Sequence, residues 1–116
     1  MKTIIIYKGE IRNKIEAARG FTWKTGWRIP VYLKDIESNS FISELNEIKD
    51  GEYKLVFGGW LSSNSYVQNL LELCSIYPIL NDEDDVTEIE ESIEKEIEEI
   101  LNDENIKVEF SSLLID

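Results

Sequence analysis

Hydrophobic residues recur every three or four positions near the C-terminal end of the chain, which is the spacing of one face of a helix. The repeating positions are Val86, Ile89, Ile93, Ile97, Ile100 and Leu101. At about 100° per residue they fall within an arc of about 120°, enough for one face to pack on a core. The pattern therefore predicts an amphipathic helix at about 86–101.

Four other segments have the apolar patterns of strands, and they lie at 2–8, 31–34, 52–58 and 106–110. The first holds an unbroken apolar run from Ile4 to Tyr7, which is typical of an interior strand. The last two alternate apolar and polar residues, as half-buried strands do. Pro30 indicates that the second strand begins there or lies at a sheet edge.

Further helices are predicted between these strands. One runs through Phe41, Leu45 and Ile48, because Ser38 or Ser40 can cap it. Another opens at about residue 66 and ends by residue 77, because Pro78 disfavours a helical residue before it. Capping boxes are expected at the starts of the last two helices, formed by Ser65 with Gln68 in the first and by Thr87 with Glu90 in the second. Asp85 is the competing N-cap of the second of these helices.

Residues 10–19 fit two alternatives, a short helix closed by Gly20 or a hairpin partner of the first strand. The order of elements predicts a single α+β domain over 1–116, with a sheet of about four strands and three to four helices packed mainly on one face. No apolar run is long enough to cross a membrane. The single cysteine and the absence of a signal-peptide pattern lead us to expect a cytoplasmic protein.

Charge is distributed unevenly along the chain. The 116 residues hold 24 acidic and 12 basic side chains, a net charge of −12. Residues 82–104 hold thirteen acids and one base, Lys95, so they carry −12 alone, whereas the first 34 residues carry +6. Two alternatives follow: the basic N-terminal segment lies against the acidic helix and neutralises it, or the acidic surface stays free for a partner.

Catalytic and metal-binding chemistry finds little support in the sequence. The chain has no histidine, which removes the common nucleophilic triads and zinc sites. Cys74 shares a helix face with Val67, Leu70 and Leu71, so we expect a buried, unreactive thiol. The acids at 82–85 lack the glycine of a calcium loop. We therefore expect no enzyme, no cofactor and no metal site.

The acidic helix supplies the candidate binding residues. Seven acids between Glu88 and Glu99 give about one charge per 2.6 Å of helix, against about 1.7 Å for duplex DNA, so the helix is a candidate nucleic-acid mimic. Trp23 and Trp27 are candidate anchors, because tryptophan is common at interfaces. The predicted partner-binding residues are Asp84, Asp85, Glu88, Glu91, Glu94, Glu98, Glu99, Trp23 and Trp27.

These features predict a non-catalytic acidic inhibitor that neutralises a basic protein partner, such as a toxin or a nucleic-acid enzyme. In size and charge the chain resembles immunity proteins that neutralise nuclease toxins, and phage-encoded inhibitors of nucleic-acid enzymes. The alternative is an accessory or oligomerising module whose acidity serves solubility. Direct nucleic-acid binding is not expected, because a chain with a net charge of −12 is repelled by phosphates.

Overall fold

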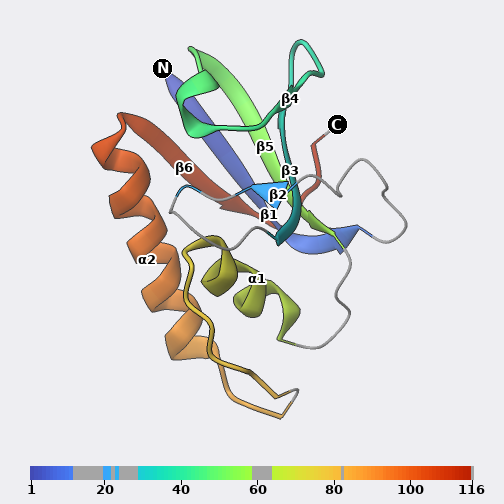
Figure 1. The fold of residues 1–116 in the computed structure, drawn as a ribbon, viewed down its shortest axis with the longest axis vertical. Helices are drawn as coiled ribbons and strands as arrows, with labels where there is room; N and C mark the ends of the chain where they lie inside the picture. Colours follow the sequence, from blue (N-terminus) through green and yellow to red (C-terminus); the bar gives the residue numbers. More distant parts are fainter. Residues whose placement is uncertain (12–19, 22, 24–28, 59–63, 82, 116) are drawn as a thin grey trace.

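The computed structural model describes residues 1–11, 20–21, 23, 29–58, 64–81 and 83–115 (Figure 1). In this part of the chain the strands are β1 (Lys2–Ile11), β2 (Gly20–Phe21), β3 (Ile29–Asp35), β4 (Phe41–Ile42), β5 (Gly51–Gly58) and β6 (Ile106–Ser111). The helices are α1 (Ser65–Leu73), α2 (Thr87–Asp103) and the 3-10 helix η2 (Leu45–Glu47). Together they form an α+β domain, as predicted.

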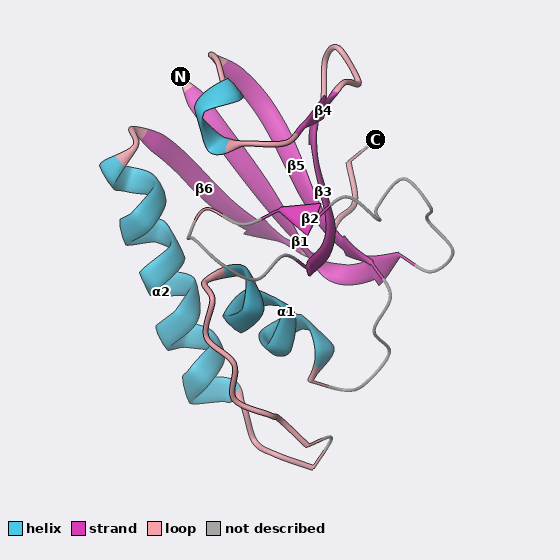
Figure 2. Cartoon of the chain, in the orientation of Figure 1, coloured by secondary structure: helices cyan, strands magenta, loops and turns pink. Residues whose placement is uncertain are grey.

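The strands form one mixed sheet with the order β2-β3-β5-β1-β6, and β4 pairs with β3 (Figure 2). β1 is interior and runs parallel to β5 and β6, whereas β3 runs antiparallel to β5. β5 and β6 flank β1 and run in the same direction, so a crossover connection must join them, and the chain supplies it through α1 and α2. The predicted strands are therefore all present, and β1 has the interior place that its apolar run indicated.

Both α-helices pack against the same core. This cluster joins the fully buried Ile4, Phe57, Leu70, Ile97 and Leu101, from β1, β5, α1 and α2. Burial of this apolar surface is the main force that holds the helices on the sheet. β5 is more deeply buried than its alternating pattern predicted, because Leu55, Val56 and Phe57 are all inaccessible to solvent.

A second, smaller cluster contains Tyr32 and Val56, with Tyr7 and Phe41 packed against it. Val56 follows Leu55 in β5, so its side chain points to the opposite face of the sheet from the main core. On that face Lys34 of β3 lies opposite Lys54 of β5 in the register. The face away from the helices therefore combines aromatic rings with lysine side chains.

The helix predicted through Phe41, Leu45 and Ile48 is wrong. The chain instead turns after β3: Asp35 Oδ1 accepts hydrogen bonds from the N–H groups of Glu37 and Ser38, at 2.9 and 3.2 Å. Asn39 completes the turn with a φ of 63°. This side-chain-stabilised turn competes with helix initiation and returns the chain as β4, which leaves only the three residues of η2 helical.

The predicted numbers of elements are also partly wrong. In the described residues the sheet has six strands, because the short β2 and β4 add to the four expected, and two α-helices are present with η2. Residues 10 and 11 continue β1, whereas 12–19 lie outside the described residues, so the choice between helix and hairpin remains open there.

Neither expected capping box forms. The N-cap positions are Asn64 for α1 and Val86 for α2, and neither makes a side-chain capping hydrogen bond. α1 ends at Leu73, four residues before the predicted limit, because Ser75 adopts a φ of 62°.

Within the described part of the chain, no helix has the length and apolarity that a membrane crossing requires.

Candidate acidic interface

α2 is the element that carries the predicted acidic surface. Ile93, Ile97 and Leu101 are buried and attach the helix to the core. The helix runs beside β6 at the margin of the fold, with its other faces turned away from the sheet (Figure 1). From Thr87 to Asp103 the helix contains eight acidic residues and one lysine, a net charge of −7. Its apolar stripe thus fixes its orientation and leaves most of its carboxylates outside.

Six of the seven predicted carboxylates are exposed to solvent. They are Asp84, Asp85, Glu88, Glu91, Glu98 and Glu99. Lys95 is also exposed and is spaced four residues from both Glu91 and Glu99, so one cation lies within the acidic face. The exposed face of α2 is therefore acidic along its length.

Glu94 differs from the other predicted residues, because its side chain is only 18% exposed. Its Oε2 accepts a 2.6 Å hydrogen bond from the Tyr66 hydroxyl of α1 and lies 3.5 Å from the Nζ of Lys8 in β1. Lys8 also lies over the Tyr66 ring, 5.9 Å from its centroid. Glu94 thus links α1, α2 and β1, and this cluster is where the N-terminal basic segment neutralises one acid of the helix.

The same cluster changes the acidity of Tyr66. Burial of the hydroxyl, and then its hydrogen bond to Glu94, raise the pKa of Tyr66 far above its ordinary value of 10.0. The phenol is therefore held protonated, as a permanent hydrogen-bond donor to Glu94. The Tyr66 ring packs edge-on against Phe57, with centroids 6.4 Å apart, which fixes the hydroxyl in place.

Asp84 and Asp85 shape the chain that leads into α2. Asp84 Oδ2 accepts a 2.9 Å hydrogen bond from Asn81 N–H, and Asp85 Oδ1 accepts one of 3.1 Å from Thr87 N–H. The bond from Thr87 lowers the pKa of Asp85. The Asn64 side chain donates to the carbonyl of Asn81 and ties this turn to the start of α1. Both aspartates thus stabilise the helix entry while remaining exposed.

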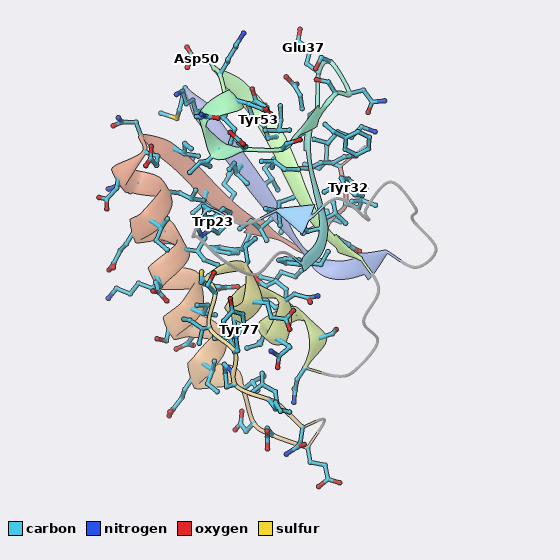
Figure 3. All side chains as sticks on the ribbon, in the orientation of Figure 1. Trp23, Tyr32, Glu37, Asp50, Tyr53 and Tyr77 are labelled. Atoms are coloured by element: carbon cyan, nitrogen blue, oxygen red, sulfur yellow. The ribbon has the colours of Figure 1, made fainter. Side chains whose placement is uncertain are left out.

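The two predicted tryptophan anchors are placed differently. Trp23 is partly buried and packs against the main core on the helix side of the sheet (Figure 3). Trp27 lies outside the described residues. The indole of Trp23 therefore contributes to the core, and the exposed acids of α2 are not joined to a described tryptophan at the surface.

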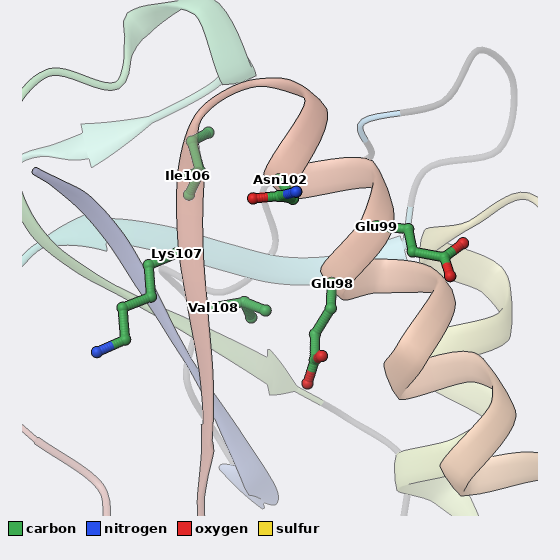
Figure 4. Close-up of a pocket in the computed structure, with 6 residues that line it drawn as sticks. All are labelled: Glu98, Glu99, Asn102, Ile106, Lys107 and Val108. Carbon is green, nitrogen blue, oxygen red and sulfur yellow. The ribbon is translucent and has the colours of Figure 1, made fainter.

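Sequence reasoning missed a groove of about 370 Å³ between α2 and β6 (Figure 4). It is lined by Glu98, Glu99, Asn102, Ile106, Lys107 and Val108. The turn at Glu104 and Asn105, where Asn105 has a φ of 60°, brings the helix back along the strand. Helical and strand periodicity predict each element separately, and neither pattern states that they lie side by side.

Cys74 is buried, as predicted. Among the residues the structure describes, no three histidine, cysteine or acidic side chains are grouped to hold a metal ion. The site is thus a surface of carboxylates beside a groove.

When the chain was compared with protein-family models, with curated proteins and with solved structures, none of the three comparisons found a match.

Proposed function

We propose that the protein acts by binding, as an acidic inhibitor of the immunity type, and that it neutralises a basic protein partner through α2. The partner class that fits best is an enzyme or toxin that acts on nucleic acid, because such proteins carry a positive surface for phosphates. On this proposal the exposed acids Glu88, Glu91, Glu98 and Glu99 make the contacts.

The observation that carries the proposal is the exposure of these four acids on a rigid helix. A buried apolar stripe holds α2 on the core, so the acids keep fixed positions relative to one another. Like-charged neighbours three or four residues apart cost a helix a few tenths of a kcal/mol each. A sequence shaped for stability alone would alternate Glu with Lys here, whereas this helix has one Lys.

The physical mechanism is electrostatic exclusion. A concentrated negative field accelerates encounter with a positive surface, and carboxylates then occupy the positions that phosphates would take. Glu94 has a different role, because its contacts with Tyr66 and Lys8 support the helix from behind. Binding of this kind weakens as salt screens the charges.

A second candidate function is an oligomerising module, and one observation supports it. Ile79 is 90% exposed and Leu113 is 75% exposed, and exposed apolar side chains can pack between copies. Light scattering at low and high salt separates the two candidates. A mass above that of the monomer that persists at high salt favours the module, whereas a monomer at both salts favours the inhibitor.

A pull-down with the tagged protein at about 50 mM and about 500 mM salt tests the main proposal. The expected result is a basic protein that is retained at low salt and released at high salt, and whose activity falls when this protein is added. Retention of proteins without excess positive charge, or a partner whose activity is unchanged, would contradict the proposal.

A further inference from the structure

β6 has one side without a strand partner. It pairs with β1 from Lys2↔Ile106 to Tyr7↔Ser111, and it is the last strand in the sheet order. In the described part of the chain, no strand pairs with its other side. Such an edge presents outward-facing N–H and C=O groups at alternate positions, and these can pair with an added strand.

The groove beside α2 opens on this edge. Ile106 belongs to the main core and Val108 packs against it, so both side chains point toward the helices. Lys107, between them, points to the opposite face of the sheet. All three residues line the same groove, and a groove lined from both faces of a strand runs along the edge of that strand (Figure 4).

We infer that β6 and α2 form a docking site for an extended basic segment of a protein partner, which adds to the sheet as a strand beside β6. This inference rests on the proposed function and specifies how the partner binds. Backbone hydrogen bonds to the edge of β6 supply the register, and basic side chains of the segment reach the acids on α2.

Charge identifies the occupant. Glu98 and Glu99 line the groove and belong to a helix with a net charge of −7. A second copy of this chain, paired edge to edge through β6, would bring two such helices next to each other along the new sheet, and like charges oppose that arrangement. The same negative charges attract a basic segment.

The alternation of a strand determines which side chains of the segment matter. Every second side chain points to the helix side, where Glu98 and Glu99 lie, and prefers lysine or arginine. The intervening side chains lie beside Lys107 and Glu109. The Lys107 Nζ lies 4.0 Å from the Glu109 Oε1, so the charges of this pair nearly cancel. The site therefore favours a strand with basic residues at alternate positions and small polar residues between them.

A synthetic peptide of roughly nine residues with alternating lysine and threonine, capped at both ends, is a suitable probe. Its matched control has the same sequence with N-methyl groups on the central amides, which removes backbone donors and keeps every charge. Fluorescence anisotropy at low salt measures affinity, and hydrogen exchange measures protection of the amides at 106–111. The expected result is slower exchange in β6 with the first peptide, and binding about tenfold weaker or more for the methylated one, equivalent to about 1.4 kcal/mol.

Two protein variants localise the effect. Glu98→Gln with Glu99→Gln removes both acids of the groove, and we expect it to weaken the peptide about three- to tenfold. Glu37→Gln with Glu44→Gln removes two exposed acids that lie outside α2 and outside the groove, and it is the matched control, with little change in peptide affinity expected.

Three results would overturn the inference. If both peptides bind equally and β6 is not protected, the peptide binds through side-chain charge alone. The docking mode would then be wrong, whereas the proposed inhibitor function would still stand. If the amides of β6 are already protected from hydrogen exchange in the free protein, and the protein has the mass of a dimer, then the edge of β6 pairs with a second copy of the chain. Absence of peptide binding at low salt would remove the site, while the partner pull-down still decides the proposed function separately.

Discussion

The Tyr66 hydroxyl donates a 2.6 Å hydrogen bond to Glu94, which joins the two helices of the fold through one carboxylate. Lys8 approaches the same oxygen at 3.5 Å from the sheet. Because the Glu94 side chain makes both contacts and is only 18% exposed, it is a structural element of the fold. The acidic helix thus has a supported side at Glu94 and an exposed face at Glu88, Glu91 and Glu99.

The Tyr66→Phe variant tests this support. It removes the hydrogen-bond donor and keeps the ring, so we expect the free energy of unfolding to fall by about 1–2 kcal/mol at neutral pH. Urea unfolding measures the change. In a double-mutant cycle with Glu94→Ala, the two changes should be less than additive, because each removes the hydrogen bond between Tyr66 and Glu94. Strict additivity would show that the two side chains do not interact in solution.

Stability should also depend on Tyr66 at alkaline pH. Burial and the Glu94 carboxylate raise the pKa of Tyr66 in the folded protein, whereas in the unfolded chain the phenol ionises near 10.0. The folded state therefore holds the proton more tightly, and its stabilisation is complete below pH 10 and declines as the pH rises above that value. Urea midpoints between pH 9 and pH 11.5 should fall more steeply for the wild type than for Tyr66→Phe. Identical slopes would contradict the assignment.

The attachment of α2 depends on its buried stripe. Ile97 is fully buried, so Ile97→Ala should lower the free energy of unfolding by about 2–5 kcal/mol through lost burial and a cavity. Ile89, on the same helix, is 37% exposed, and Ile89→Ala should cost clearly less. Thermal and urea unfolding compare the two. Equal losses would mean that the helix is not docked in this orientation.

Glu98→Lys should separate stability from binding. The change replaces a like-charge pair with Glu94 by an attractive pair, and it places a cation nearer the negative end of the helix. It also places the new lysine three residues after Lys95, as a like-charged neighbour, which offsets part of this gain. We expect a net stabilisation of a few tenths of a kcal/mol, together with weaker partner binding. A variant that is less stable and binds normally would show that Glu98 serves the fold.

The sequence predicted α2 well because its apolar stripe has helical spacing, and Ile93, Ile97 and Leu101 of that stripe are buried. It failed at 38–42, where Ser38 or Ser40 was read as a helix cap, whereas Asp35 stabilises a turn within a hairpin. Local pattern cannot separate these outcomes, because the same side chains stabilise both by bonding nearby N–H groups.

The candidate site was predictable only as a set of charges. The position of Glu94 depends on Tyr66, which lies 28 residues earlier, and on Lys8 in the first strand. Three elements distant in sequence must fold together before that carboxylate becomes buried. The groove beside β6 has the same origin, since it exists only where the helix and the edge strand meet.

The central claim is that exposed carboxylates of α2 bind a basic partner. The most direct test compares the affinity of the partner captured at low salt for two triple variants. Glu91, Glu98 and Glu99 are changed to Lys in the first, and the exposed Glu37, Glu44 and Glu52 are changed in the second. Glu37 lies well apart from α2 (Figure 3). Each triple raises the net charge from −12 to −6, so global charge is matched.

Calorimetric titration at about 50 mM salt supplies the affinities, and circular dichroism checks that both variants keep their helices. We predict that the α2 triple binds at least about tenfold more weakly, a loss of about 1.4 kcal/mol or more, while the control triple changes the affinity much less. Equal weakening by both triples would show that net charge alone governs binding. Unchanged affinity in the α2 triple would contradict the account.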